Sequence, residues 1–141
     1  MKAVTSDDLA AELRGLYPAL ASLPESTLAA ALDKADVVSL AAGTPLFGEG
    51  SVCRQFPLVL AGSIRVAKVG EGRELHLYRV TPGESCVLTS SCLVGRRDYP
   101  ATGVVESDVR LVVLPKTVFD ELVASHPPFL QYVFEIGRAH V

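Results

Sequence analysis

Apolar residues at the start of the chain recur at the spacing of a helix. Leu9, Leu13 and Leu16 follow one another at intervals of four and three residues. The residues in front of them, Ser6-Asp7-Asp8, are types that favour a helix N-terminus. This pattern predicts a short amphipathic helix from about Asp7 to Gly15.

A second helix is predicted a few residues later. Ser22 and Glu25 have the spacing of a capping box, and Pro24 stands where a first helical turn would begin. Leu28 and Leu32 give this helix an apolar face. We expect both helices to pack against a sheet formed by the residues that follow.

From Val37 the pattern changes to short apolar runs separated by glycine-rich turns. The runs are VVSL, TPLF, FPLVLA, SIRVAKV, ELHLYRV, TGVVE and VRLVVL. Runs of this length with turn signals about every ten residues are typical of an antiparallel sandwich or barrel. Ala61-Gly62 lies between two of these runs and has the composition of a tight two-residue hairpin loop.

One further helix is predicted after the last run. Pro115 suits its first turn, and the proline pair Pro127-Pro128 is expected to end it. Its inner face would carry Val118, Phe119 and Leu122. A last helix is predicted to begin at Phe129.

Composition narrows the class of protein. A chain of 141 residues suits one domain, and 49% hydrophobic against 21% charged residues indicates a packed core. No apolar run approaches the roughly 18 residues of a membrane span, and acids occupy the place of a signal-peptide core. A net charge of −3 provides no basic surface for nucleic acid, and three cysteines suit reduced thiols. These features predict a cytoplasmic protein with no membrane partner.

The last seven residues, EIGRAHV, are unusual. They back-translate to GAG ATC GGA AGA GCA CAC GTC, which resembles a common sequencing-library adapter. We therefore assign residues 7–134 to the domain and interpret residues 135–141 as an artefact.

The candidate chemistry is concentrated between Arg79 and Gly103. This stretch contains a turn, Thr81-Pro82-Gly83, followed by an acid at Glu84. It then carries Ser85, two cysteines at Cys86 and Cys92, two adjacent arginines at Arg96 and Arg97, and Tyr99, where a strand is expected to begin.

Four phrases, AAGTPLFGEG, FPLVLAGSIRV, LYRVTPGESC and LPKTVFDEL, give the chain a family resemblance. From about Leu13 to Phe134 it resembles the N-terminal sensor domain of Crp/Fnr-family transcription regulators. The resemblance implies a mainly β fold, a double-stranded β-helix or jelly roll of the cyclic-nucleotide-binding type with short flanking helices. It also implies a homodimer in the full-length protein and a C-terminal winged helix-turn-helix that contacts DNA. We expect that DNA-binding domain to be absent from this chain.

The resemblance implies an effector pocket at Gly83, Glu84 and Ser85. In cyclic-nucleotide binders of the family, a Gly-Glu pair holds the ribose, and a following Arg-Ser or Arg-Thr pair neutralises the phosphate. The positions of that second pair fall on Tyr99 and Pro100, which supply no positive charge. A buried phosphate without a cation is costly, so we predict no physiological binding of cyclic AMP. The alternative is a cyclic-nucleotide module in which Arg96 or Arg97 folds back to the phosphate.

Cys86 and Cys92 are predicted to flank a short helical turn. Backbone N–H groups at such a turn favour the thiolate, the reactive form, so this pair could sense redox state or sulfur species. A disulfide requires their Cα atoms to lie within about 7 Å of each other. The competing interpretation is that both are core residues, since free cysteine is among the most buried residue types.

The sequence does not identify a cofactor. Cys53, Cys86 and Cys92 are one thiolate short of the four that an iron–sulfur cluster or structural zinc usually takes, and His76 is a candidate for the missing ligand. Haem is also compatible with the family, but neither group has a full ligand set here. A cupin-type metal enzyme would require histidines close in sequence, whereas His76 and His126 are 50 residues apart. We therefore predict that the domain is not an enzyme.

Overall fold

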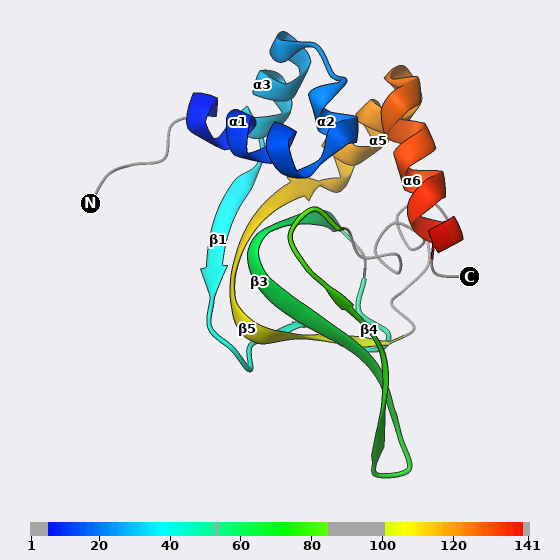
Figure 1. The fold of residues 1–141 in the computed structure, drawn as a ribbon. Helices are drawn as coiled ribbons and strands as arrows, with labels where there is room; N and C mark the ends of the chain where they lie inside the picture. Colours follow the sequence, from blue (N-terminus) through cyan, green and yellow to red (C-terminus); the bar gives the residue numbers. More distant parts are fainter. Residues whose placement is uncertain (1–5, 53, 85–100, 140–141) are drawn as a thin grey trace.

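The fold is a curved antiparallel sheet with all its helices gathered at one end (Figure 1). The computed structural model describes residues 6–52, 54–84 and 101–139. The elements are helices α1 (Ser6–Leu16), α2 (Pro18–Ala21) and α3 (Glu25–Asp33), strands β1 (Asp36–Leu40), β2 (Pro45–Phe47), β3 (Gln55–Gly70), β4 (Arg73–Val80) and β5 (Thr102–Pro115), and helices α5 (Lys116–Ser125) and α6 (Pro127–Ala139). None of the described helices has the length and apolar character to cross a membrane.

The sheet has the strand order β1-β5-β3-β4, and β2 pairs separately with β5. Every described pairing is antiparallel. Strands β3 and β5 are long because each joins two of the apolar runs, and they pair along most of their length, from Gln55 opposite Pro115 to Ala67 opposite Thr102. The prediction of a mainly β fold with short flanking helices is confirmed.

The predicted helices are present, with corrections at their ends. The capping box is wrong: Pro24 is the N-cap of α3 without a side-chain hydrogen bond. Ser22 instead follows α2, a helix that the sequence did not predict, and its hydroxyl donates to the carbonyl of Pro18 at 3.2 Å. Pro127 ends α5 as predicted but also begins α6, two residues before Phe129. Helix α6 includes residues 135–139, so the interpretation of residues 135–141 as an artefact stays a prediction.

The predicted hairpin at Ala61-Gly62 is wrong. Strand β3 includes both residues and does not reverse direction there. Its pairing with β5 shifts register around Gly62, which has φ +82°. A Cβ atom at this position would lie 2.1 Å from the carbonyl oxygen of Asp108, so glycine permits a bend rather than a reversal. The actual hairpin joins β3 to β4 further along, where Glu71 and Gly72 have φ values of +52° and +74°.

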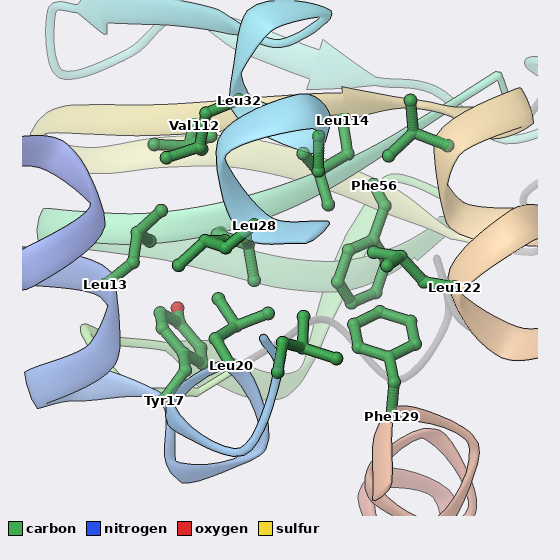
Figure 2. Close-up of a cluster of buried hydrophobic side chains, with 14 of the residues drawn as sticks. Leu13, Tyr17, Leu20, Leu28, Leu32, Phe56, Val112, Leu114, Leu122 and Phe129 are labelled. Atoms are coloured by element: carbon green, nitrogen blue, oxygen red, sulfur yellow. The ribbon is translucent and has the colours of Figure 1, made fainter. Parts of the chain in front are cut away.

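Two groups of buried side chains form the core. The helix-side cluster lies between the helices and the near end of the sheet, and its largest members include Tyr17, Phe56, Phe119 and Phe129 (Figure 2). The sheet-side cluster lies within the curve of the sheet and consists of Val59, Ile64, Val66, Val80, Ala101, Val105, Val109 and Leu111. Phe47 packs against both clusters and connects them.

Candidate functional site

The structure describes only part of the predicted effector pocket. Gly83 and Glu84 lie at the end of the turn after β4. The other predicted residues lie outside the described residues: Cys53, Ser85, Cys86, Cys92, Arg96, Arg97 and Tyr99. Their roles as effector or redox residues therefore stay predictions. The described residues show how the turn Thr81–Glu84, which precedes most of these residues in the sequence, is held in place.

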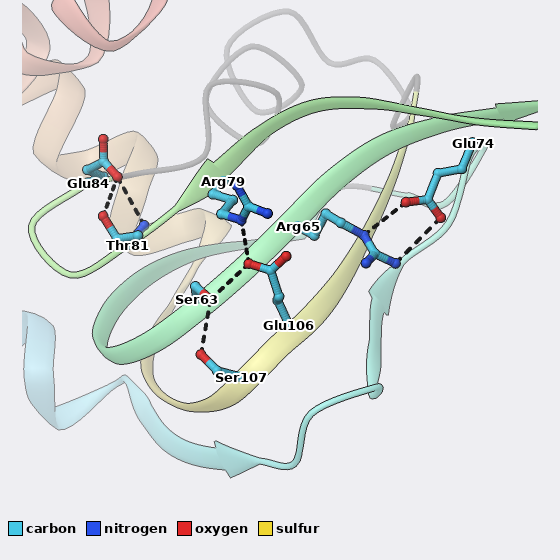
Figure 3. Close-up of polar contacts among 8 residues, drawn as sticks. All are labelled: Ser63, Arg65, Glu74, Arg79, Thr81, Glu84, Glu106 and Ser107. Atoms are coloured by element: carbon cyan, nitrogen blue, oxygen red, sulfur yellow. Dashed lines mark hydrogen bonds and ion pairs between the residues drawn. The ribbon is translucent and has the colours of Figure 1, made fainter.

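The turn Thr81–Glu84 is closed by Glu84 itself. The backbone N–H of Glu84 donates to the carbonyl of Thr81 at 2.9 Å, and Gly83 has φ +86°. One carboxylate oxygen of Glu84 accepts from the backbone N–H of Thr81 at 3.1 Å and from the Thr81 hydroxyl (Figure 3). A ribose that binds to this carboxylate would have to compete with both contacts.

The backbone of the same turn is held from the helix side by Tyr17. The Tyr17 hydroxyl lies 2.7 Å from the carbonyl oxygen of Glu84 and accepts from the backbone N–H of Val59 at 2.9 Å. Burial raises the pKa of Tyr17 well above its ordinary value, with Tyr132 adding to the effect. The phenol is therefore neutral, and keeps its proton to donate, throughout the physiological pH range.

A row of polar side chains crosses three strands next to the turn (Figure 3). Arg79 of β4 and Glu106 of β5 form an ion pair at 2.5 Å, and the hydroxyl of Ser63 on β3 lies 3.3 Å from the same carboxylate oxygen and 3.0 Å from the hydroxyl of Ser107. The hydrogen bond from Arg79 holds the pKa of Glu106 below its ordinary value. Alongside, Arg65 pairs with Glu74 at 2.9 Å. Both arginines are thus already neutralised by carboxylates.

The inner face of the sheet is apolar where it is described. Ile64 and Val66 alternate along β3 with Ser63 and Arg65, so the polar row lies on the opposite face from the sheet-side cluster. The described members of that cluster, and the partly buried hydrophobic residues packed against it, include no charged side chain. These hydrophobic residues would offer no cation to a phosphate, and the prediction about Tyr99 and Pro100 lies outside the described residues.

The histidines occupy separate elements. His76 is an exposed residue of β4 opposite Ala67, and His126 is the C-cap of α5. Within the described ranges no cluster of three metal-ligating side chains is found, but these ranges contain none of the three cysteines. The question of a metal or cluster on Cys53, Cys86 and Cys92 is therefore not tested.

The roles of Tyr17 and of the polar row were not predicted from the sequence. Tyr17 stands in an apolar stretch, LRGLYPAL, whose pattern indicates burial but gives no partner for the hydroxyl. The Arg79–Glu106 pair joins residues 27 positions apart on strands that are not neighbours in the sheet. Neither contact has a local signal, because each depends on the curvature of the sheet.

Comparison with known families agrees with this architecture. Residues 37–126 match the model of the cyclic nucleotide-binding domain family, which is more than half of the chain. The chain belongs to this family, and its fold is the jelly roll of the family, as the resemblance implied. No match was found among curated protein sequences.

Solved structures with the same fold come from regulatory proteins. The sensor domain of the transcriptional regulator DNR from Pseudomonas aeruginosa matches with a TM-score of 0.78 and 16% identity, over 90% of this chain and 85% of that one. The regulatory subunit of a cAMP-independent protein kinase A from Trypanosoma brucei matches with a TM-score of 0.80 and 16% identity, over 94% of this chain and 47% of that one.

A protein from Eubacterium rectale assigned to the Crp/Fnr family of transcriptional regulators gives a TM-score of 0.78. It is 23% identical over 89% of this chain, which spans 59% of its length. This chain therefore corresponds to only a part of the Eubacterium and Trypanosoma proteins. At these identities the likeness establishes the fold alone.

Proposed function

We propose that this chain is the effector-sensing domain of a cytoplasmic Crp/Fnr-type transcription regulator that does not respond to cyclic AMP. The observation that carries this proposal is the apolar interior of the described sheet, together with Arg65 and Arg79 paired to carboxylates on its outer face. The positions expected to hold the phosphate arginine carry Tyr99 and Pro100. A cyclic phosphate bound there would lose its hydration without gaining a counter-charge.

The signal that we propose is oxidation of a thiol pair, Cys86 and Cys92. Both residues come shortly after the turn Thr81–Glu84 in the sequence, and the Tyr17 hydroxyl anchors this turn to the rest of the fold. In the balanced reaction, two thiols and one hydrogen peroxide give one disulfide and two waters. The disulfide would hold the Cα atoms of the two cysteines within about 7 Å of each other.

The full-length protein would convert this signal into DNA binding. In this proposal it is a homodimer, and DNA is contacted by a separate C-terminal domain, in keeping with the likeness to regulators longer than this chain. The chain's own net charge of −3 agrees with DNA contact lying elsewhere. The proposal assigns no catalytic activity to the domain.

The second candidate is a cyclic-nucleotide-binding module, which the family match supports. In that case Arg96 or Arg97 would supply the charge for the phosphate. The two candidates differ in ligand and in residues, so one set of samples distinguishes them.

The test combines intact-mass spectrometry with calorimetry on oxygen-free protein. Treatment with hydrogen peroxide is expected to remove two hydrogens per chain, and Cys86→Ser or Cys92→Ser should abolish this loss. Cys53→Ser is the matched control and should retain it. Titration with cyclic AMP is expected to give no binding heat.

Three outcomes would contradict the proposal. A peroxide-treated chain of unchanged mass would make the cysteines core residues, and bound iron, sulfide or zinc in the untreated protein would make them ligands. Binding of cyclic AMP that is lost in Arg96→Ala or Arg97→Ala would establish the second candidate instead.

A further inference from the structure

Tyr17 lies at the junction of the helix layer and the sheet. It is the N-cap of α2, follows α1 directly, and has 0% of its surface exposed. Its hydroxyl is within hydrogen-bond distance of three backbone groups from two other parts of the chain. Side chains that connect segments so far apart in sequence define how those segments are placed relative to one another.

The geometry shows how the single phenolic proton is used. The carbonyl oxygen of Glu84 at 2.7 Å is nearer than that of Val59 at 3.1 Å, so the proton is donated mainly to Glu84. The oxygen in turn accepts from the N–H of Val59 at 2.9 Å. Val59 lies next to a shift in register between β3 and β5. The Tyr17 hydroxyl therefore provides an acceptor for a backbone N–H beside an irregular part of the strand pairing.

A second contact holds the same turn against α1. A Cβ atom on Gly83 would lie 3.0 Å from the carbonyl oxygen of Leu16, the last residue of α1. Gly83 also has φ +86°, which other residues rarely adopt. Gly83 therefore lies against Leu16, the last residue of α1, and the Glu84 carbonyl accepts from the hydroxyl of Tyr17, the next residue of the chain.

The ring of Tyr17 connects this junction to α6. Its centroid lies 6.4 Å from that of Tyr132 in an edge-on arrangement, and Tyr132 lies 6.2 Å from Phe129 on the same helix. Helices α2 and α6 are in contact, and Figure 1 shows α6 beside α2 and α5 at the helix end of the molecule. The ring of Tyr17 is therefore part of the surface against which α6 packs.

We propose that Tyr17 is a positioning residue that couples the turn Thr81–Glu84 to α6. This inference rests on the proposed function, because Glu84 is where the chain enters the stretch that carries the candidate effector residues. A change that pulls on the Glu84 carbonyl weakens its bond to the Tyr17 hydroxyl and shifts the ring against Tyr132. A shift of the Tyr17 ring would thus be passed to α6 through Tyr132.

The first test uses Tyr17→Phe in the reduced protein. This variant keeps the ring and its packing but leaves the Glu84 carbonyl and the Val59 N–H without their partner. Hydrogen exchange followed by mass spectrometry is expected to show about tenfold faster exchange in peptides covering Val59, Thr81–Glu84 and α6. Thr102→Val is the control, because it removes one side-chain hydroxyl bonded to a strand carbonyl, that of Ala67 at 3.0 Å, away from Tyr17. It should not accelerate exchange at Thr81–Glu84 or α6.

A second variant keeps the inference testable if Tyr17→Phe fails to fold. Gly83→Ala forces the turn away from the Leu16 carbonyl while leaving the Tyr17 hydroxyl in place, and should accelerate exchange in the same peptides. Unchanged exchange at Thr81–Glu84 in the folded variants, or an equal increase throughout the sheet, would overturn the inference.

The second test measures coupling to the proposed signal. In the wild-type protein, peroxide treatment is expected to alter exchange in α6; in Tyr17→Phe, the cysteines should still lose two hydrogens, but the change in α6 should be absent. If the wild-type cysteines do not react, the proposed function fails, whereas the positioning role is still decided by the reduced protein. If they react and α6 responds equally in both proteins, Tyr17 does not carry the coupling.

Discussion

Gly62 allows the two longest strands to bend together. Its φ of +82° and the 2.1 Å that would separate an added Cβ from the Asp108 carbonyl leave no room for any other residue. The loop between β1 and β2 is also bonded to Asp108, since the backbone N–H of Ala42 donates to the Asp108 carboxylate at 2.9 Å. The bend at Gly62 thus contributes to the curvature that encloses the sheet-side cluster.

The first prediction compares two glycines that share a positive φ. Gly62→Ala combines backbone strain with a clash against backbone, so we expect a loss of about 3 kcal/mol in unfolding free energy. Gly72→Ala, at φ +74° with nothing within 4 Å of the added atom, should lose only about 1 kcal/mol from strain. Urea denaturation followed by circular dichroism measures both. Equal losses would show that the close approach to Asp108 contributes nothing.

At the scale of elements, α6 is attached to the domain through an aromatic cluster. Phe129 is fully buried, and its ring centroid lies 6.1 Å from that of Phe56 on β3 (Figure 2). It lies 5.8 Å from the ring centroid of Phe119 on α5, and both pairs are edge-on. Edge-on aromatic pairs add to the stabilisation from burial alone. Helix α6 is therefore bound to both the sheet and α5.

The second prediction concerns the removal of this attachment. Phe129→Ala is expected to lower the unfolding free energy by about 3 kcal/mol, through lost burial and the cavity that remains. Gln131→Ala is the matched control on the same helix: Gln131 is exposed, its side chain donates only to Glu135 at 3.3 Å, and the change should stay within about 0.5 kcal/mol. Thermal denaturation distinguishes them, and a Phe129→Ala protein as stable as Gln131→Ala would mean that α6 is held by other contacts.

At the scale of the molecule, the two buried clusters form one folding unit. Phe47 packs against both, and its ring lies so close to Gly103 that an added Cβ there would be 2.3 Å from it. Strands β3 and β5 also pass through both clusters, with Phe56 and Val112 in one, and Val66 and Val105 in the other. Neither cluster can lose its packing without disturbing strands that the other needs.

The third prediction is a single cooperative unfolding transition. Far-ultraviolet circular dichroism, which reports the helices and strands, and tyrosine fluorescence should give the same midpoint. Phe47→Ala should lower that midpoint, with a loss of about 2 kcal/mol, and Phe47→Leu, which keeps apolar bulk, should lower it less. Separate midpoints in the wild-type protein would show that the helix layer unfolds independently of the sheet.

The fold could be predicted from the sequence where the signal is local. The leucine stripe at Leu9 and Leu13, and the face of Val118, Phe119 and Leu122, became helices with those residues buried, because a helix repeats its buried face every few residues. The apolar runs became strands, in which every second side chain points to the same face of the sheet. The hairpin at Ala61-Gly62 could not be judged locally, since glycine suits both a reversal and a bend, and only pairing with Asp108 in β5 decides between them.

The candidate site, too, could be predicted from the sequence only in part. The sequence by itself determined the family, the turn before Glu84 and the lack of an arginine at Tyr99 and Pro100, because these are properties of residue type and order. Only the tertiary structure decided that Tyr17 holds the Glu84 carbonyl, 67 residues away. A hydroxyl buried in an apolar stretch must find a partner, but which partner it finds depends on how the helices are placed on the curved sheet.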